Sequence, residues 1–212
     1  MFKLAVFVSG GGTNLQALLD RIADGTLSDI AIELVVASKQ NTRAQQRAEQ
    51  AGIDCVVMDR SEYADTLLYD HALSRLLTDR PVDLIVLAGF MCLLGPELVQ
   101  NYRNRIINIH PSLIPAFCGH GLYGIRPHQA ALEYGVKLSG ATVHFVDEHY
   151  DTGPILIQKS VAIKNGDTPE LLQKRVMEEA EQIILPQAVS MIAAGRVRIE
   201  GRRTVIMEDE SI

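Results

Sequence analysis

The stretch that decides the fold is residues 4–15, LAVFVSGGGTNL, in which five apolar residues run into a glycine-rich turn and then into a helix-like segment. A continuous apolar run is typical of a strand that is covered on both faces, as in a parallel sheet. A glycine turn after such a strand lets the chain enter a helix whose first backbone amides can bind an anion. The stretch therefore predicts the first β-α unit of an α/β fold, with a candidate phosphate site at its turn.

The same alternation continues along the chain. Further strands are expected over residues 32–37, 55–58, 84–87, 106–110, 141–146, 155–163, 197–199 and 204–207. Helices are expected over residues 14–23, 43–51, 61–80, 96–102, 127–134 and 168–194. Ser61 is the expected N-cap of the third helix, and Thr168 that of the last. The order predicts a three-layer, doubly wound, mostly parallel Rossmann-like sheet with an antiparallel C-terminal part.

Composition narrows the class of protein. The 212 residues carry 20 Lys and Arg against 26 Asp and Glu, a formal charge of −6, which argues against nucleic acid as a partner. The three cysteines, Cys55, Cys92 and Cys118, form no close pair, so neither a disulfide framework nor a zinc knot is expected. No apolar run approaches the roughly 18 residues of a membrane span. We therefore expect a cytoplasmic protein without membrane contact. The chain is expected to form a single domain over residues 1–212, with halves 1–95 and 96–212.

The glycine turn is the first candidate site. The Walker loop is excluded because no Gly-Lys-Ser/Thr follows, and Leu15 stands where the dinucleotide pattern needs its third glycine. A phosphate monoester fits better, with Thr13 and Asn14 as side-chain donors. The alternative is a turn that only lets the helix pack on the sheet.

The second candidate is the strand end Asn108-Ile109-His110. Residues two apart on a strand project from the same face, so the Asn108 amide and the His110 imidazole form a pair. An amide can stabilise an oxyanion and a histidine is the usual proton carrier near neutral pH, which suits acyl transfer. Two polar residues satisfied in an internal network are the alternative.

The third candidate is Asp151, in the polar connection 147–153 between two apolar strands. A carboxylate held in a tight turn can orient an imidazole or a water molecule. By itself the residue is equally consistent with a surface turn, and spacing alone does not bring it to His110. His128 and His144 have no metal-binding spacing with His110, so no metal is expected.

Together these pieces resemble the phosphoribosylglycinamide formyltransferase family of folate-dependent enzymes. The resemblance covers nearly the whole chain, to about Arg198. The motifs Asn108-x-His110-Pro-Ser-Leu-x-Pro and Asp151-x-Gly-Pro mark the wider folate formyltransferase and hydrolase core, and the turn from Ser9 to Gln16 narrows it to this branch.

The resemblance implies formyl transfer from 10-formyltetrahydrofolate, as co-substrate, to the amine of 5'-phosphoribosylglycinamide in purine biosynthesis. Half 1–95 would then bind the substrate phosphate and half 96–212 would bind folate and hold the catalytic residues. The resemblance implies Asn108, His110 and Asp151 as catalytic residues, and Gly12, Thr13, Asn14 and Glu181 as ligands of the phosphate and ribose. It implies a folate pocket lined by Met91, Cys92, Leu93, Leu94, Asp147, Glu148, His149 and Tyr150.

Three alternatives stay open beside formyl transfer. Hydrolysis of the same folate would use the same residues, but such hydrolases usually carry an additional N-terminal domain, for which 212 residues leave no room. Methionyl-tRNA formyl transfer would be expected to need a basic RNA-binding extension. A non-catalytic sensor of nucleotide phosphate would keep the glycine turn without the chemistry. The expected partners of the protein are small-molecule substrates. The protein itself is expected to be a monomer or a homodimer.

Overall fold

The computed structural model describes residues 1–207. The chain divides into two units, residues 1–108 and the unit that begins at Ile109, and the division falls inside a strand. The two halves expected from the sequence meet earlier, at residues 95 and 96, and the single domain over 1–212 stays a prediction. Its last five residues lie outside the described part of the chain.

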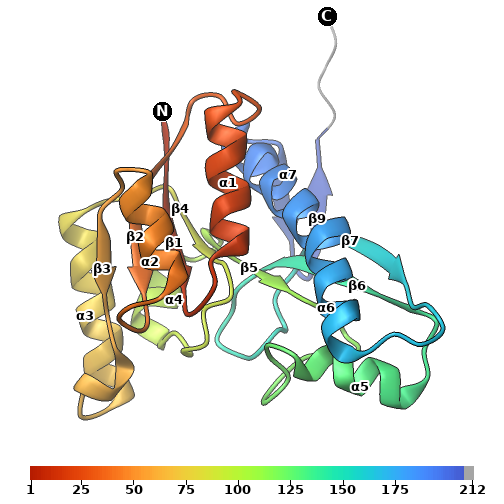
Figure 1. Cartoon of the computed structure of the whole chain (residues 1–212). Coiled ribbons are helices and arrows are strands. Elements are labelled where there is room, and N and C mark those ends of the chain that lie inside the picture. Colours follow the sequence, from red (N-terminus) through yellow and green to blue (C-terminus); the bar gives the residue numbers. More distant parts are fainter. Residues whose placement is uncertain (208–212) are drawn as a thin grey trace, which may run out of the picture. The chain divides into compact units, whose positions relative to one another are not determined.

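The first unit is built from parallel strands joined by helices (Figure 1). Its elements are β1 (Phe2–Val8), α1 (Thr13–Ala23), β2 (Ile30–Ala37), α2 (Arg43–Gln50), β3 (Cys55–Val57), the short 3-10 helix η1 (Arg60–Glu62), α3 (Thr66–Asp79), β4 (Leu84–Leu87), α4 (Pro96–Asn101) and the start of β5 (Ile106–His110). β1 pairs in parallel with β2 and β4, β2 with β3, and β4 with β5. Residues 4–8 of β1 are fully buried, as their continuous apolar run predicts.

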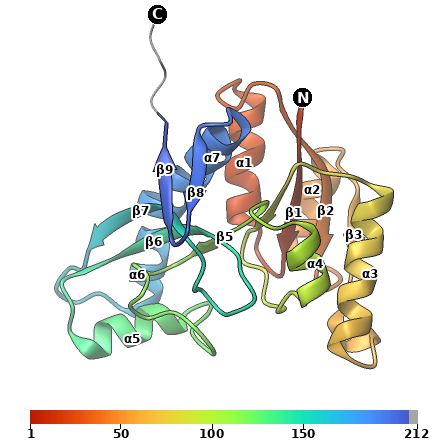
Figure 2. The same ribbon diagram turned by 180° about the vertical axis from the view of Figure 1, so that it is seen from behind.

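Helices cover both faces of this part of the sheet. α1 packs against α2 and α3 packs against α4, and the two opposite views place α1 and α4 on opposite faces (Figures 1 and 2). α1 has an apolar side on which Leu15 and Leu18 are buried. Because each helix returns the chain to the start of the next parallel strand, loops that follow the strands gather at one edge of the sheet.

The second unit contains an antiparallel pair and the C-terminal helices. Its elements are α5 (Arg126–Tyr134), β6 (Leu138–Phe145), β7 (Ile155–Ala162), α6 (Pro169–Val176), the π-helical turn η2 (Met177–Glu181), α7 (Gln182–Ala193), β8 (Val197–Glu200) and β9 (Arg203–Ile206). β6 pairs antiparallel with β7, and β8 with β9. The seven strands of the main sheet follow the order β3-β2-β1-β4-β5-β6-β7. The mostly parallel, doubly wound sheet with an antiparallel C-terminal part is confirmed.

Two helix predictions need correction. The helix expected over residues 61–80 begins only at Thr66, because Asp65 accepts the Leu68 N–H at 2.8 Å and caps it, while Ser61 lies in η1. The helix expected over 168–194 contains the π turn over 177–181. Its predicted beginning is confirmed: the Thr168 hydroxyl accepts the Leu171 N–H at 3.3 Å. No helix of residues 1–207 has both the length and the apolar character needed to cross a bilayer.

Candidate active site

The end of β5 presents the two residues that sequence spacing pairs. Asn108 is half-buried and His110 is 5% exposed, and the alternation of the strand places them on the same face. Ile106, Ile107 and Ile109 around them are buried. The strand therefore fixes the backbone of both polar residues in an apolar setting.

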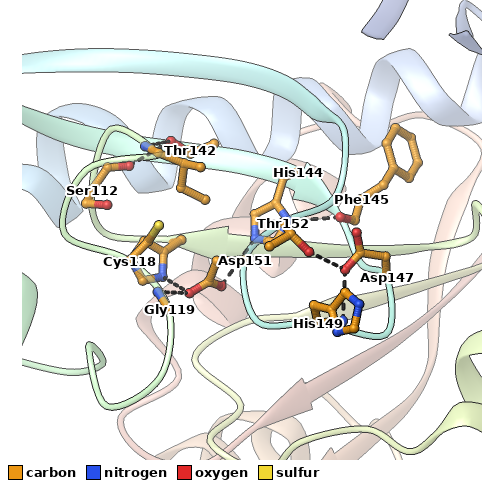
Figure 3. A network of polar contacts seen from close by, with 12 residues as sticks. Ser112, Cys118, Gly119, Thr142, His144, Phe145, Asp147, His149, Asp151 and Thr152 are labelled. Atoms are coloured by element: carbon orange, nitrogen blue, oxygen red, sulfur yellow. Dashed lines mark hydrogen bonds and ion pairs between the residues drawn. The ribbon is translucent and has the colours of Figure 1, made fainter. Parts of the chain in front are cut away.

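Asp151 reaches His110, a contact that spacing alone does not establish. The Asp151 Oδ2 atom lies 3.6 Å from His110 Nδ1 and accepts the Gly119 N–H at 2.8 Å. The Asp151 backbone has φ 54°, in the left-handed region, which turns its carboxylate away from the course of an extended chain. Figure 3 shows the carboxylate beside Gly119. The structure thus brings Asp151 and His110 together within the second unit.

The second nitrogen of His110 is anchored as well. Nε2 lies 3.2 Å from the Phe117 carbonyl oxygen, and because a carbonyl only accepts, this nitrogen donates. Burial lowers the pKa of His110, and this effect outweighs the opposing effects of the Asp151 charge and the Phe117 bond. The neutral imidazole is therefore favoured at pH 7, in a position to accept a proton.

The carboxylate is held in its charged form. Burial raises the pKa of Asp151, but hydrogen bonding to His144, the positive charge that His110 carries when it is protonated at low pH, and the Gly119 N–H together outweigh it, so the pKa is lowered. His144 contributes through Nε2, which lies 3.5 Å from Asp151 Oδ1. The sequence presents His144 only as a possible metal ligand and gives no sign of this contact, because no local pattern in residues 141–146 points to residue 151.

A hydroxyl holds the loop that follows β5. The Thr142 hydroxyl donates to the Ser112 carbonyl at 2.7 Å (Figure 3). It also accepts the Ile114 N–H at 3.1 Å. Gln158 on β7 donates to the same hydroxyl at 3.0 Å and to the Ile114 carbonyl at 2.9 Å. β6 and β7 therefore fix the start of the loop that carries Phe117 and Gly119.

The connection before Asp151 contains four of the predicted folate-lining residues. Asp147 Oδ1 accepts the His149 N–H at 3.0 Å and the Thr152 hydroxyl at 2.7 Å, which closes the turn on itself (Figure 3). Glu148, His149 and Tyr150 are exposed. Asp147 has a structural part in this turn, and folate binding by the four residues stays a prediction.

The glycine turn of the first unit has the geometry of a helix entry. Gly12 has φ 69°, and a Cβ there would lie 2.8 Å from Ala44, so glycine is required. α1 begins at Thr13 without a side-chain cap among residues 1–207, and Asn14 is buried. Arg47 on α2 donates to the Gly11 carbonyl at 3.0 Å and to Gln16 at 2.6 Å, which fixes the turn from the side.

Ser9 links the glycine turn to the segment after β4. Its hydroxyl oxygen accepts the Met91 N–H at 2.8 Å and the Ser38 hydroxyl at 2.7 Å. In the segment predicted to line a folate pocket, Met91 and Leu93 are exposed, Cys92 is half-buried and Leu94 is buried. The first unit therefore holds the predicted phosphate turn next to this segment.

Glu181 lies in the second unit, at the end of η2, and is buried. η2 packs against β6 and β7. A π turn inserts one residue into a helix and occurs frequently at functional sites. Contact of Glu181 with a ribose stays a prediction. Within residues 1–207, no group of three or more His, Cys, Asp and Glu side chains is arranged to hold a metal ion.

A buried imidazole beside a fixed carboxylate, at the end of a strand in an α/β sheet, is the arrangement of an enzyme that moves protons. Comparison with known proteins identifies the class more closely. Residues 2–189 match the formyl transferase family. The chain belongs to this family.

Named relatives and a solved structure agree with this assignment. The chain is 41% identical over 198 residues to the chloroplastic phosphoribosylglycinamide formyltransferase of Arabidopsis thaliana, covering 92% of this chain and 67% of that protein. It is 42% identical over 197 residues to the trifunctional purine biosynthetic protein adenosine-3 of Gallus gallus, covering 93% of this chain but 19% of that protein. The crystal structure of glycinamide ribonucleotide transformylase 1 from Symbiobacterium toebii superposes with a TM-score of 0.92 at 41% identity, covering 98% of this chain and 95% of that chain. The chain thus spans about a fifth of its trifunctional relative and most of the bacterial one.

Proposed function

We propose that the protein transfers the formyl group of 10-formyltetrahydrofolate to the amine of 5'-phosphoribosylglycinamide. The observation that carries the proposal is the environment of His110: a buried imidazole, 3.6 Å from Asp151, at the end of a strand that also presents Asn108. The relatives named for this reaction support the choice of substrates. This formyl transfer is a step of purine biosynthesis.

The reaction requires the transfer of one proton. The substrate amine attacks the formyl carbon, the bond from that carbon to the folate nitrogen breaks, and the proton lost by the amine must reach the leaving nitrogen. His110, neutral at rest, accepts this proton and delivers it. In this step the substrate displaces the Phe117 carbonyl from Nε2, and the one proton of the neutral ring moves to Nδ1, which then donates to Asp151 and orients the ring. The lone pair of Nε2 is then free to accept the proton of the amine.

Charge develops on the formyl oxygen during the attack. The Asn108 amide, on the same face of β5 as His110, donates to this oxygen. The substrate phosphate binds at the start of α1, where backbone amides and Thr13 serve as donors beside Gly12 and Asn14. Glu181 contacts the ribose. Residues 91–94 of the first unit and residues 147–150 of the second unit are the proposed folate-binding residues.

The experiment combines the protein with both substrates and follows the products by mass spectrometry. Formylglycinamide ribonucleotide and tetrahydrofolate are expected together. A folded protein that binds both substrates and forms no formylated amine contradicts the proposal. The two catalytic candidates separate an enzyme from a sensor, since Asn108→Ala and His110→Ala leave ligand binding by a sensor unchanged but lower the turnover of an enzyme by about 10²-fold or more.

Partners and location follow from the same proposal. The partners of the protein are the two small-molecule substrates. The protein acts as a monomer or a homodimer, and the cytoplasm is its expected compartment. A relative named as chloroplastic shows that proteins of this family also work in an organelle. Fractionation of the source cells tests the compartment, and recovery in an organelle contradicts it.

A further inference from the structure

Helix α2 holds the glycine turn through contacts to which the proposed reaction assigns no function. The Gly10 carbonyl oxygen accepts the Ala44 N–H at 3.1 Å, and the Gly11 carbonyl oxygen accepts Arg47 Nε at 3.0 Å. Ala44 lies in the first turn of α2, where backbone N–H groups have no acceptor within their own helix. One helix therefore fixes two successive carbonyls of the turn.

The direction of each carbonyl determines the direction of the next amide. In a trans peptide the C=O bond and the following N–H bond lie in one plane and point in opposite directions. The peptide bonds of the turn are trans. Because the Gly10 and Gly11 carbonyls are directed at α2, the N–H groups of Gly11 and Gly12 point away from α2. No backbone carbonyl among residues 1–207 accepts either of these N–H groups.

The Arg47 side chain is itself held in place against the turn. A Cβ on Gly12 would lie 3.4 Å from Arg47 Cδ, so the aliphatic part of the side chain packs beside the turn. Arg47 Nη1 donates to Gln16 Oε1 at 2.6 Å, and Gln16 Nε2 donates to Asp20 Oδ1 at 2.8 Å. Because an ionised carboxylate only accepts, Asp20 keeps the oxygen of the Gln16 amide directed at Arg47. Helix α1 therefore orients the guanidinium that binds Gly11.

We propose that Arg47 is a positioning residue for the substrate phosphate, which holds the Gly11 carbonyl away from the anion and thereby directs the Gly12 N–H towards it. The inference rests on the proposed function, which places the phosphate at the start of α1. A carbonyl oxygen carries partial negative charge and repels a phosphate, whereas an N–H group attracts one. Arg47 donates from Nε and Nη1 to groups of the protein, so its effect on the phosphate passes through the turn.

Attraction between the Arg47 charge and the phosphate is the competing explanation. A lysine at this position keeps the positive charge but lacks the planar fork that binds the Gly11 carbonyl and Gln16 together. Arg47→Lys therefore preserves attraction by charge and removes the fixed geometry, whereas Arg47→Gln removes both. Arg43→Gln is the matched charge control, because Arg43 is an exposed cation in the first turn of the same helix.

A role of Arg47 in stability alone predicts a different pattern of binding. General damage to the first unit weakens a ligand that carries the phosphate and a ligand that lacks it to the same extent. The ratio of the two dissociation constants therefore reports on the phosphate contact, because the rest of the ligand is the same in both measurements.

The experiment measures, by calorimetry, the binding of 5'-phosphoribosylglycinamide and of the same molecule without its phosphate. The wild type is compared with Arg47→Lys, Arg47→Gln and Arg43→Gln, each shown to be folded by urea unfolding. We expect the preference for the phosphorylated ligand to fall about 10-fold in both Arg47 variants and to stay unchanged in Arg43→Gln. An unchanged preference in Arg47→Lys overturns the proposal, and a loss confined to Arg47→Gln assigns the effect to charge.

A second variant tests the same geometry with Arg47 in place. Gln16→Leu removes the acceptor of Arg47 Nη1 and is expected to lower the same preference by a smaller factor. If neither Arg47 variant folds, an unchanged preference in Gln16→Leu overturns the proposal.

Kinetics add a readout in the active enzyme. In Arg47→Lys, KM for the phosphorylated substrate is expected to rise about 10-fold while kcat stays within about twofold, because the residues that carry the chemistry are unchanged. A fall in kcat with an unchanged KM contradicts a role in holding the phosphate.

The wild-type protein separates failure of this proposal from failure of the proposed function. If the wild type binds both ligands equally, the phosphate site of the proposed function and the role of Arg47 are both wrong. If the wild type prefers the phosphorylated ligand and both Arg47 variants keep the full preference, the phosphate site stands and the role of Arg47 is refuted.

Discussion

Gly153 lies so close to Phe145 that a Cβ on the glycine would overlap the Phe145 carbonyl oxygen. The same oxygen accepts the Nδ1 proton of His144 at 2.8 Å. The backbone approach therefore couples the turn that carries Asp151 to the end of β6, and it explains why glycine occupies the position two residues after Asp151.

We expect Gly153→Ala to displace this turn. The overlap is with backbone, which has little freedom to move, so the free energy of unfolding should fall by about 2–3 kcal/mol. A displacement of Asp151 by about 1 Å should lower kcat about 100-fold. Urea unfolding and formyl-transfer kinetics measure both. Gly10→Ala is the stability control, because no atom lies within 4 Å of a Cβ there. An equal loss of unfolding free energy in Gly10→Ala and Gly153→Ala would refute this explanation.

Asp70 caps a helix that is distant in sequence. Its buried carboxylate accepts the N–H groups of Gly95, Glu97 and Leu98, at 3.1, 2.8 and 3.3 Å, and so joins α3 to the start of α4. Asp70→Ala leaves these donors unpaired and should cost about 2 kcal/mol of unfolding free energy. Asp70→Asn keeps one acceptor and should cost less. Chemical denaturation of both variants measures the difference, and an alanine variant as stable as the wild type would disprove the capping role.

Asp167 and Arg175 form a bidentate ion pair, with Asp167 Oδ1 2.6 Å from an Arg175 amino group. The hydrogen bonds from Arg175 hold the pKa of Asp167 at about 2, below the ordinary value of 3.8. Because the folded-state pKa is depressed, the pair stabilises the fold above about pH 4, and this contribution is lost as the pH falls towards 2.

Asp167→Asn should therefore be less stable than the wild type at pH 6, and the difference should shrink between pH 4 and pH 2. Thermal unfolding at a series of pH values measures it. A difference that stays constant across this range would show that the asparagine acts through packing and not through the charge.

Removal of the proposed catalytic side chains should lower the rate of the reaction while the protein still folds. Asn108→Ala removes a donor to the oxyanion and should lower kcat about 10²–10³-fold. His110→Ala removes the proton carrier and should lower kcat about 10²–10⁴-fold. Both proteins should bind the phosphorylated substrate at the glycine turn, as calorimetry can measure. Normal turnover in either variant would remove that residue from the proposed mechanism.

Sequence patterns predict the parts of this protein whose signal is local. The buried strands β1 and β4 are visible as apolar runs, and the shared face of Asn108 and His110 follows from the two-residue period of a strand. The cap at Thr168 with Pro169 and Glu170 is likewise a local signal. These features could be predicted because each depends on neighbours within a few residues.

Other features depend on contacts that no spacing encodes. The left-handed backbone at Asp151 decides where its carboxylate points, and in the folded chain the carboxylate meets His144, which lies on β6. The true start of α3 was missed because Ser61 and Asp65 are both acceptable caps, and the pattern does not rank them. The π turn before α7 adds one residue to a helix without changing its composition.

The most direct test of the account compares the two products of one reaction mixture. The protein is incubated with 10-formyltetrahydrofolate, with and without 5'-phosphoribosylglycinamide, and both the tetrahydrofolate released and the formyl group captured by the amine are measured. We predict equal amounts of the two products with the acceptor present, and negligible tetrahydrofolate release when water is the only acceptor. Tetrahydrofolate release at the same rate without the acceptor would contradict the account and identify a hydrolase.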